Sequence, residues 1–419
     1  MTKKKVIIVG GGFAGIQLVK RLDKNLFDIL LIDKLNHHQF QPLFYQVATS
    51  QIEPASIAFP LRHILKSEKN VQVRMAEMTA VDQKKNKIST DIGEFKYDYL
   101  VIAIGCSTNF FGNAEIEEHS MTLKSTYDAI KIRNHILSAF EHLVSLSEKE
   151  RFLNLVIVGA GPTGVELAGA FAEIKKNILP KDYPGIDFSK FKIILVEGSK
   201  STLNSMSHTA SIASMKYLAE MGVNIITETF VTSFDGEKVI LSNKEVIQTK
   251  SVIWTAGVIG NSVTGLPEPL ITKGRRIKAD RYNTIEGSQN IFAVGDIALM
   301  ETPKYKTGHP QLANVAITQA NLLAKNLKSI EYKKPLREYE YRDLGSMATI
   351  GNNKAVVDLP FLKFTGHFAW FIWMFLHLML ILSVRNKIVI FFDWAWKFIT
   401  KDTSLRLILV ETDNKTHPD

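Results

Sequence analysis

Two sets of three glycines, each directly after an apolar run, are the residues of this chain best suited to bind phosphate. The first set occupies residues 10–15, after the apolar run 6–9, and the second occupies residues 159–164, after the run 155–158. In each set the first glycine permits a tight strand-to-helix turn and the second lets the backbone approach a pyrophosphate. The third lets helix and strand pack closely. Two such sets predict an enzyme that holds two dinucleotides.

A carboxylate ends the strand that follows each glycine set. Asp33 stands 23 positions after Gly10, close to the spacing of roughly 20 expected for a residue that binds an adenosine ribose. Glu197 stands 38 positions after Gly159, and an inserted loop accounts for the longer spacing. A carboxylate there hydrogen-bonds a ribose 2′-OH and repels a 2′-phosphate, so we expect NADH rather than NADPH. The neighbouring Lys200 leaves NADPH open as the alternative.

Glu166 is the residue best placed for proton chemistry. It follows Gly164 by two positions and therefore falls near the start of the second expected helix. There it would contact the nicotinamide and sit near a flavin, where a carboxylate relays protons or tunes the electrostatics. The alternative is an acidic residue that only complements a positive helix N-terminus.

Asp296 indicates which dinucleotide each glycine set binds. It follows Gly295 and the apolar run 291–294, late in the chain. In flavoproteins with two dinucleotide sites, a strand followed by Gly-Asp presents the carboxylate to the ribityl chain of the flavin. We therefore expect FAD at the first glycine set and NADH at the second. The run 253–257, a strand that ends in small residues, fits the same architecture.

A polar stripe occupies the segment 311–319. Its pattern predicts a helix with Gln311, Asn314 and Thr318 on one face. The helix N-terminus, around Ala313, would aim backbone N–H groups at the flavin ring and stabilise negative charge on the reduced cofactor. An ordinary helix with a polar stripe is the alternative.

The expected cofactor-binding residues fall into two groups, and no cluster with metal-ligand spacing is found, so no metal site is expected. Those expected at the FAD site are Gly10, Gly12, Phe13, Ala14, Gly15, Asp33, Lys34, Gly105, Gly295, Asp296 and Ala313. Those expected at the NADH site are Gly159, Gly161, Thr163, Gly164, Glu197, Ala256 and Gly257.

Alternating strands and helices must position these residues, which predicts an α/β fold with parallel, doubly wound sheets. The chain is long enough for two Rossmann-like dinucleotide-binding domains followed by a further region. We expect an FAD-binding domain at 1–112 and 281–334, an NADH-binding domain at 113–280, and a C-terminal membrane-anchoring region with amphipathic helices at 335–419.

Two weaker patterns give local predictions. The insertion 177–191 contains Pro180, Pro184 and Gly185, which predicts a surface loop. Beyond residue 335 the pattern predicts short strands at 339–341 and 347–350.

Composition narrows the class of protein. The single cysteine, Cys106, excludes a disulfide framework and any mechanism that needs a redox-active cysteine pair within this chain. A net charge of +9 favours an anionic partner. No RNA-binding motif or recognition helix is found, so we expect no nucleic acid. The chain has no secretory segment before its first strand, which indicates the cytosolic side.

The C-terminal tail is where the anionic partner is expected. Four of the five tryptophans lie in the last 50 residues: Trp370, Trp373, Trp394 and Trp396. Residues 367–384 carry no formal charge, but His367 and His377 interrupt them, and 18 helical residues reach only about 27 Å. Tryptophan favours the headgroup boundary, and six Lys/Arg against two Asp in 361–410 attract anionic lipid. We expect an interfacial helical hairpin; a true span and a soluble dimer interface are the alternatives.

Together these residues resemble the type II NADH:quinone oxidoreductases, over essentially the whole chain. The segments that carry the resemblance are residues 10–15, 41–48, 159–166, 293–296 and the aromatic, basic tail ending near 406–408. The resemblance implies a monotopic enzyme of the respiratory chain, on the cytoplasmic face of the cell membrane, with a homodimer as one option. Such an enzyme takes hydride from NADH onto FAD and passes two electrons to a membrane quinone without pumping protons.

The resemblance also implies roles for single residues. Glu166 matches the family's glutamate beside nicotinamide and quinone. Residues 313–320 resemble the segment that carries paired glutamines in the family, at the flavin–quinone junction. Here Asn314 and Thr318 stand at the corresponding positions, followed by Gln319, so the quinone's hydrogen-bond partners depart from the family pattern.

Two other functions are also compatible with the sequence. One is a soluble NADH-dependent flavoprotein reductase that donates electrons to a protein acceptor. The other is a flavin-based binding or signalling protein. Sulfide:quinone and disulfide reductases are disfavoured because Cys106 alone cannot make their catalytic pair.

Overall fold

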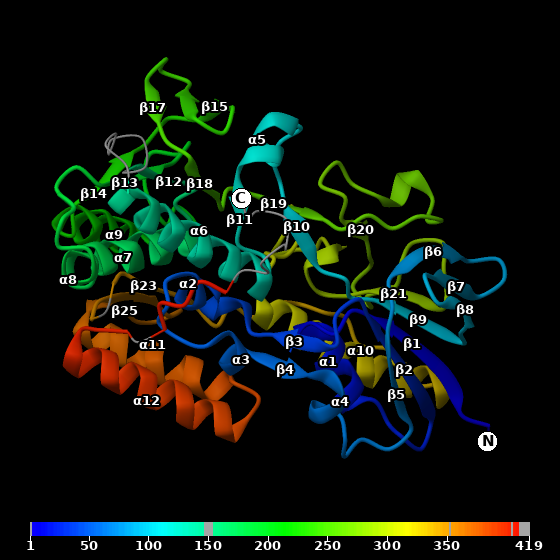
Figure 1. Cartoon of the computed structure of the whole chain (residues 1–419). Helices are drawn as coiled ribbons and strands as arrows, with labels where there is room; N and C mark the ends of the chain where they lie inside the picture. The colour runs from blue at the N-terminus through cyan, green and yellow to red at the C-terminus, as the bar shows by residue number, and fades with distance from the viewer. Residues whose placement is uncertain (1, 146–153, 352, 404, 410–419) are drawn as a thin grey trace, which may run out of the picture. The chain divides into compact units, whose positions relative to one another are not determined.

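The computed structural model describes residues 2–145, 154–351, 353–403 and 405–409 (Figure 1). Contacts within the chain divide it into two compact units. Unit 1 comprises the residues up to Gln39, Phe59–Ser107 and Val258–Leu344. Unit 2 comprises Phe40–Ala58, Thr108–Gly257 and the described residues from Gly345 onward. These units follow packing, and the division of the chain by cofactor stays a prediction.

Unit 1 is built on a five-stranded parallel sheet. Its strands, in spatial order, are β21 (Ile291–Ala293), β9 (Tyr99–Ile102), β1 (Lys4–Val9), β2 (Phe27–Asp33) and β5 (Val71–Met75). The strand β1 contributes four consecutive buried residues, as expected for a parallel strand covered on both faces. The order reverses between β1 and β9, which makes the carboxyl ends of these strands the expected place for a ligand.

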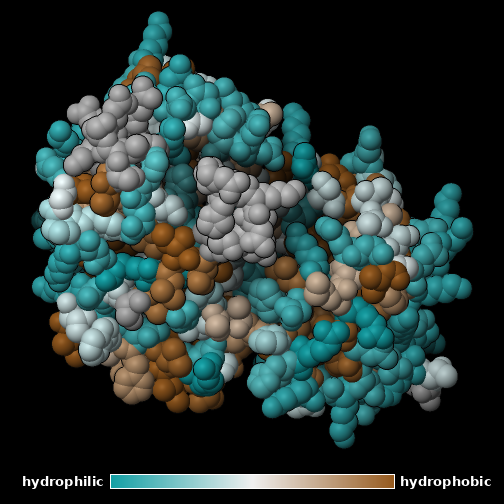
Figure 2. Space-filling view, in the orientation of Figure 1, coloured by the Kyte–Doolittle hydropathy of each residue, from teal (hydrophilic) through white to brown (hydrophobic). Residues whose placement is uncertain are grey.

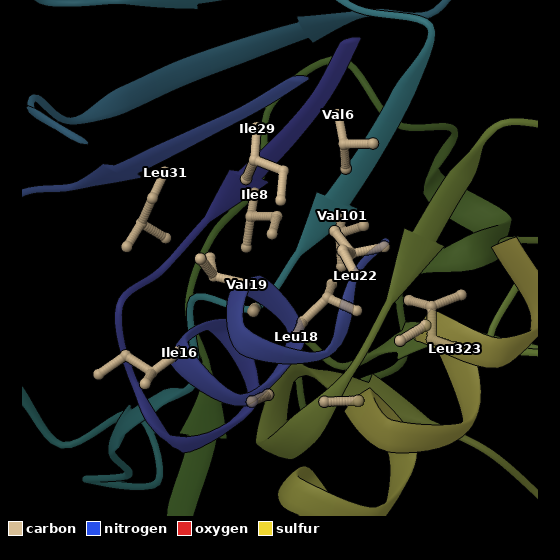
Figure 3. Close-up of a cluster of buried hydrophobic side chains, with 14 of the residues drawn as sticks. Val6, Ile8, Ile16, Leu18, Val19, Leu22, Ile29, Leu31, Val101 and Leu323 are labelled. Atoms are coloured by element: carbon tan, nitrogen blue, oxygen red, sulfur yellow. The ribbon is translucent and has the colours of Figure 1, made fainter. Parts of the chain in front are cut away.

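Two helices cover one face of this sheet, α1 (Phe13–Arg21) and α10 (Ala313–Glu331). Side chains of α1 such as Leu18 and Val19 pack on Ile8 and Ile29 of the sheet, and Leu323 of α10 joins the same core (Figure 3). At about 25 cal/mol per Å² of apolar surface removed from water, this core supplies much of the stability of unit 1. Because residues of both β1 and α1 belong to this core, their packing sets the position of the turn between them.

The other elements of unit 1 are short. An antiparallel sheet consists of β6 (Met78–Asp82), β7 (Lys87–Thr90) and β8 (Gly93–Lys96), and a short helix is α4 (Leu61–Ile64). Further strands pair in twos: β3 (His37–Gln39) with β4 (Ala58–Pro60), β10 (Cys106–Thr108) with β19 (Val258–Gly260), and β20 (Ile277–Lys278) with β22 (Ala298–Leu299). Short 3₁₀ turns lie at Glu268–Leu270 and Gly295–Ile297; a third, at Gln41–Leu43, belongs to unit 2.

Unit 2 repeats the parallel sheet. Its strands, in spatial order, are β11 (Met121–Thr122), β18 (Ser251–Trp254), β12 (Asn154–Val158), β13 (Lys192–Val196) and β14 (Val223–Ile226). The helices are α2 (Phe44–Ala48), α3 (Pro54–Ile57), α5 (Ala114–His119), α6 (Thr126–Ser145), α7 (Pro162–Asn177), α8 (Leu179–Asp182) and α9 (His208–Glu220). An antiparallel sheet adds β15 (Val231–Phe234), β16 (Lys238–Leu241) and β17 (Val246–Gln248). The two parallel sheets confirm the expected α/β fold with duplicated Rossmann-like units.

The C-terminal part of unit 2 is a small sheet followed by two helices. The antiparallel strands are β23 (Ser346–Thr349), β24 (Ala355–Asp358) and β25 (Lys363–Gly366), and the helices are α11 (His367–Leu380) and α12 (Val384–Thr400). Figure 1 draws α11 in orange and α12 in red, side by side. The expected pair of tail helices is confirmed. Within the residues described, we find no helix with both the length and the apolarity needed to cross a membrane.

Two local predictions were wrong. The segment 177–191 is not a plain surface loop, because it forms α8 and buries Leu179 and Phe191 in the core. Pro180 lies in the first turn of α8, where proline is tolerated, so it does not interrupt structure there. Residues 339–341 form no strand. Their aromatic side chains are buried by packing instead of by pairing in a sheet.

The polar stripe of residues 311–319 is only partly helical. The helix α10 begins at Ala313, so Gln311 precedes it and cannot share its face with Asn314 and Thr318. Gln311 instead donates its Nε2 hydrogen to the carbonyl oxygen of Asp296, at 3.1 Å.

Candidate functional site

The first glycine set turns the chain from β1 into α1. Gly10 adopts a φ of +110°, and a Cβ there would overlap the carbonyl oxygen of Ala103, just after β9. A Cβ on Gly15 would overlap the carbonyl oxygen of Gly10. A Cβ on Gly12, the N-cap of α1, would meet nothing within 4 Å. The outer glycines are therefore required by packing, and the inner one leaves the helix N-terminus open.

The second glycine set has the same geometry. Gly159 adopts a φ of +96°, and a Cβ there would press on the backbone of Ala256, after β18. A Cβ on Gly164 would overlap the carbonyl oxygen of Gly159, whereas one on Gly161, the N-cap of α7, would meet nothing within 4 Å. The repeat seen in the sequence is thus a repeat of atomic geometry.

The two carboxylates also occupy equivalent positions. Asp33 accepts the backbone N–H of Gly11 at 2.5 Å and that of Leu35 at 2.7 Å. Glu197 accepts the backbone N–H of Ala160 at 2.6 Å and that of Ser199 at 2.8 Å. Each carboxylate therefore fixes a glycine turn and keeps lone pairs for hydroxyl donors. Burial raises the pKa of Asp33, and its two backbone donors oppose that change.

The remaining expected residues lie around the same turns. Gly105 follows β9 and Gly257 follows β18, the strands beside the two glycine turns. Thr163 lies in the first turn of α7. Phe13 and Ala14 open α1, and the exposed Lys34 follows Asp33.

The residues present at both turns fit a bound dinucleotide. Neither Gly12 nor Gly161 provides a side-chain cap, so the backbone N–H groups of the first turns of α1 and α7 are left for an anion. The open space beside each inner glycine admits a pyrophosphate, and the carboxylate at the end of the neighbouring strand completes a ribose site.

Asp296 lies in a turn that is contacted by Gln319, Ala14 and Cys106 of unit 1. The backbone N–H of Gly295 donates to Oε1 of Gln319 at 2.8 Å, and a Cβ on Gly295 would lie 3.5 Å from the Cβ of Ala14. This contact puts the turn beside the first turn of α1. The thiol of Cys106 donates to Asp296 Oδ2 at 3.4 Å. The buried Gln319 therefore holds the Gly295–Asp296 turn in place through this hydrogen bond.

The structure also shows what surrounds Asn314 and Thr318. The hydroxyl of Thr318 donates to the carbonyl oxygen of Asn314 at 2.7 Å and lies 2.7 Å from the hydroxyl of Tyr339. Tyr339 belongs to a buried cluster with Met300 and Tyr341. Thr318 thus has hydrogen-bond partners within unit 1, which the sequence pattern did not indicate.

Glu166 is buried in the second turn of α7, in unit 2. Its Oε1 accepts the backbone N–H of Thr349, in β23, at 3.3 Å. Burial raises the pKa of Glu166 to about 8, and the hydrogen bond from Thr349 opposes the rise. At neutral pH the carboxyl is therefore mostly protonated. Because Oε1 accepts a backbone hydrogen, the proton is favoured on Oε2.

A chain of hydrogen bonds joins Glu166 to the last helix. The indole N–H of Trp394, in α12, donates to Gln46 Oε1 at 2.8 Å, and Gln46 Nε2 donates to the hydroxyl of Tyr45 at 3.0 Å. The Tyr45 hydroxyl lies 2.8 Å from Thr349 Oγ1, and the backbone of Thr349 reaches Glu166. Burial, followed by the charge of Glu166, raises the pKa of Tyr45 well above its ordinary value, so Tyr45 stays neutral.

A pocket opens beside Glu166. Its lining comes from α2, α7, α11, α12 and the turns after α2 and β23, all in unit 2: Tyr45, Gln46, Gln51, Glu166, Ala170, Glu173, Gly351, Trp370, Trp373, Trp394 and Lys397. Three tryptophans give it aromatic walls, and the neutral carboxyl of Glu166 and the Glu173–Lys397 ion pair provide polar contacts. This combination suits a flat aromatic ligand with polar oxygens. We name it the tryptophan cavity.

Sequence reasoning missed several residues of this region. Tyr45 and Gln46 entered only as part of a resemblance, and Lys397 was counted among the basic residues facing lipid. Lys397 is instead buried, and its Nζ lies 3.2 Å from Oε2 of Glu173 in α7. In unit 1, His38 was also missed: its Nδ1 lies 3.1 Å from the carbonyl oxygen of Gly11, and burial lowers its pKa to about 4. A neutral His38 therefore supports the first glycine turn.

The outer faces of α11 and α12 carry exposed apolar side chains, shown brown at the lower left of Figure 2. On α11 the spacing is that of one helix face, and α12 repeats it: Phe368, Phe371, Phe375 and Met379, then Val384, Ile388, Phe392 and Ile399. The inner face is different, because His377 stacks on Trp373 with 4.2 Å between ring centroids. Burial lowers the pKa of His377 to about 4, so it adds no charge to this helix. Large apolar patches of this kind mark interaction surfaces.

Two family models match the chain. One is described as pyridine nucleotide-disulphide oxidoreductase and matches residues 4–320; the other is described as the NDH2 C-terminal domain and matches residues 344–401. A type II NADH:quinone oxidoreductase of Mycobacterium tuberculosis is 33% identical, over 95% of this chain and 87% of its own length. One from Staphylococcus aureus is 28% identical, over 84% of this chain and 89% of its own length.

Solved structures share the fold. NDH2 from Plasmodium falciparum, in complex with NADH, superposes with a TM-score of 0.89 at 22% identity, covering 97% of this chain and 100% of that one. The sulfide:quinone oxidoreductase of Aquifex aeolicus superposes with a TM-score of 0.73 at 21% identity, covering 95% and 96%.

Proposed function

Because this chain belongs to the type II NADH:quinone oxidoreductases, we propose that it reduces its quinone in the tryptophan cavity of unit 2, beside Glu166. The protein is a membrane-associated flavoenzyme that oxidises NADH through FAD and reduces a quinone. The expectations of family, activity and cofactors are thereby confirmed. Nothing favours a soluble reductase with a protein acceptor.

The observation that carries the proposal is a neutral carboxyl in an aromatic cavity. A bound flavin supplies a two-electron carrier between nicotinamide and quinone. A quinone oxygen gains negative charge as electrons arrive, so it needs a hydrogen-bond donor rather than a carboxylate. Glu166, with its pKa near 8, presents such an O–H at neutral pH and can transfer the proton to that oxygen. The tryptophan rings would hold the flat quinone ring and exclude water.

The activity is tested in two steps. Anaerobic NADH should bleach the flavin absorbance, and a short-chain quinone added afterwards should restore it. If the first step succeeds and no quinone restores the colour, the quinone assignment falls. A panel of benzoquinones and naphthoquinones identifies the preferred acceptor.

We also propose that Asp33 binds the ribose of FAD and that Glu197 selects NADH. Replacing Glu197 with glutamine removes the charge that repels a 2′-phosphate while keeping one acceptor for the backbone N–H groups. The ratio of kcat/KM for NADH to that for NADPH should fall about tenfold, which corresponds to about 1.4 kcal/mol. The ratio is read from steady-state rates with each cofactor. Glu228→Gln, which neutralises an exposed carboxyl nearby, is the matched control. An unchanged ratio in Glu197→Gln removes its proposed role.

The membrane attachment is proposed to use the apolar face of α11 and α12, at the cytoplasmic face of the cell membrane, with anionic lipid as partner. The exposed Lys363, Arg385 and Lys401 flank this face, whereas the buried Lys397 does not contribute. A homodimer stays part of the proposal, and sedimentation of the detergent-solubilised protein tests it.

Charges placed on this face should release the protein. Replacing Phe375, Met379 and Phe392 with aspartate should lower binding to vesicles by at least 100-fold, because burial of each apolar side chain contributes about 1.5–3 kcal/mol. Co-sedimentation with phosphatidylglycerol vesicles and with neutral vesicles measures the loss and the share due to anionic lipid. As a control, the same change is made at three exposed apolar residues on α6 and α9: Tyr127, Val144 and Ile212. Equal binding of both triple variants would reject this face as the anchor.

A further inference from the structure

A second cavity adjoins the tryptophan cavity. It is lined by Gln51, Glu173, Ile174, Asn177, Ile178, Lys397, Lys401 and Thr403, all in unit 2. Three of these residues, Gln51, Glu173 and Lys397, also line the tryptophan cavity. The Glu173–Lys397 ion pair therefore stands at the junction of two cavities.

Two helices run along both cavities. On α7, Glu166, Ala170 and Glu173 line the first cavity at intervals of four and three residues, and the same stripe continues to Asn177 in the second. On α12, Trp394 and Lys397 line the first cavity, and Lys401, the C-cap of the helix, lines the second. The exposed Lys401 indicates that the second cavity lies toward solvent. A stripe of cavity-lining residues, polar except for Ala170, thus leads from near the surface to Glu166.

The Glu173–Lys397 ion pair places two charged side chains largely out of contact with water. The side chains of Lys397 and Glu173 are only 10% and 13% exposed. Taking both charges out of water costs free energy that their attraction often fails to return, so stability alone does not explain the pair. Burial lowers the pKa of Lys397, with Glu173 opposing the change, which makes its ammonium a readier proton donor than an exposed lysine.

The reaction itself demands a proton route. Oxidation of NADH yields two electrons and one proton, whereas a quinone takes two electrons and two protons to become a quinol. One proton per turnover must therefore come from water. The apolar face of α11 and α12 gives no polar path for it. The second cavity does.

We propose that Glu173 and Lys397 pass this proton from the second cavity into the tryptophan cavity, an inference that rests on the quinone binding proposed above. The quinone oxygen takes the proton of Glu166, and the carboxylate left behind takes a proton from the Lys397 ammonium. The Lys397 amine is then reprotonated through the carboxyl of Glu173, which draws its proton from solvent. Each O–H or N–H bond that breaks is replaced by one that forms, and all three groups return to their starting states.

Other titratable groups face this route. The charged and titratable residues that line the two cavities are Tyr45, Glu166, Glu173, Lys397 and Lys401. Tyr45 keeps its proton because burial raises its pKa well above the ordinary value, so it holds Thr349 in place and does not compete for the transferred proton.

The test separates proton transfer from electron transfer. In Glu173→Gln, reoxidation of the NADH-reduced flavin by a short-chain quinone, followed by stopped flow, should slow at least tenfold. Reoxidation by ferricyanide, which takes electrons without protons, should keep its rate. The quinone reaction of the variant should show an increased solvent isotope effect.

Two controls guard against a merely structural effect. Glu68→Gln breaks a comparable half-buried ion pair, Lys24–Glu68 in unit 1, and should change neither rate. Because Glu173→Gln leaves a buried ammonium without its counter-charge, the double variant Glu173→Leu/Lys397→Met is also made; it should fold well and still react slowly with quinone.

Equal slowing of the reactions with quinone and with ferricyanide, or a normal rate of quinone reduction in the Glu173 variants, would overturn the proposal. If Glu166→Gln also leaves the quinone rate and KM unchanged, the quinone site itself is wrong; if only Glu173→Gln is silent, the route alone is wrong.

Discussion

Replacing Glu166 with glutamine should slow quinone-driven reoxidation of the reduced flavin by at least 100-fold while leaving its reduction by NADH within a few-fold of normal. Glutamine keeps the size of the side chain and an acceptor for the Thr349 N–H but has no transferable proton. Single-turnover kinetics with NADH and then quinone measure the two steps separately. Glu166→Asp shortens the chain but keeps the acid, and it should recover part of the rate.

The pH dependence gives an independent reading of the same group. Since the pKa of Glu166 is raised to about 8, the proton donor is present at neutral pH and is lost as the pH rises through 8. The quinone step should therefore fall about tenfold per pH unit above 8, and this dependence should vanish in Glu166→Gln. A profile that is flat to pH 10 in the unmodified protein would contradict the assignment of Glu166 as the acid.

Stability should respond to the same titration in a definite direction. Between the ordinary carboxyl pKa of 4.5 and the raised value of about 8, the folded state binds the Glu166 proton more tightly than the unfolded state. Stability contributed by the protonated form is thus fully present below pH 4.5 and is lost as the pH rises through 8, at up to about 1.4 kcal/mol per unit. In Glu166→Gln this part of the decline should disappear.

The second large effect is expected at Gly15. A Cβ on alanine at this position would overlap the carbonyl oxygen of Gly10, so α1 must move away from β1. Forcing extra volume into such a packed place costs about 3 kcal/mol, and the displaced helix N-terminus no longer faces the pyrophosphate. Gly15→Ala should therefore lose at least 100-fold in FAD affinity and have a lower Tm, measured from the flavin content of the purified protein and from thermal unfolding.

Gly12→Ala separates the two causes. A Cβ there meets no protein atom within 4 Å, so the unliganded fold should keep its Tm. The same methyl group would stand where the pyrophosphate approaches the backbone, so FAD affinity should still drop. If Gly15→Ala binds FAD normally, the close approach of α1 to β1 is not what builds the site.

The parts of the site that the sequence revealed are those within one supersecondary unit. Asp33 and Glu197 were found because strand, turn and helix follow one another directly, and their bonds to the backbone of Gly11 and Ala160 confirm the repeated geometry. Whether these residues bind ribose stays a prediction. The periodicity of the tail likewise indicated two helices correctly.

The polar network around Glu166 had no such local signal. It brings together Tyr45, Thr349, Trp394 and Lys397 from separate stretches of chain, and only tertiary packing makes them neighbours. Lys397 looked like one more basic residue of the tail, because composition does not tell which helix face turns inward. The wrong strand at 339–341 has a similar cause, since aromatic residues favour buried surfaces in general and not only paired strands.

The hydrogen-bond chain from Trp394 to Glu166 has a consequence for how such an enzyme can change. The helix that presents Phe392 and Ile399 outward also supplies an indole donor and an ammonium to the cavity on its inner side. In the function proposed here, attachment and chemistry therefore use opposite faces of one helix, and neither face can change without affecting the other. A truncation designed to make the protein water-soluble would remove a wall of its own reaction chamber, and a homologue adapting to a different lipid would have to keep every third or fourth residue of this helix fixed.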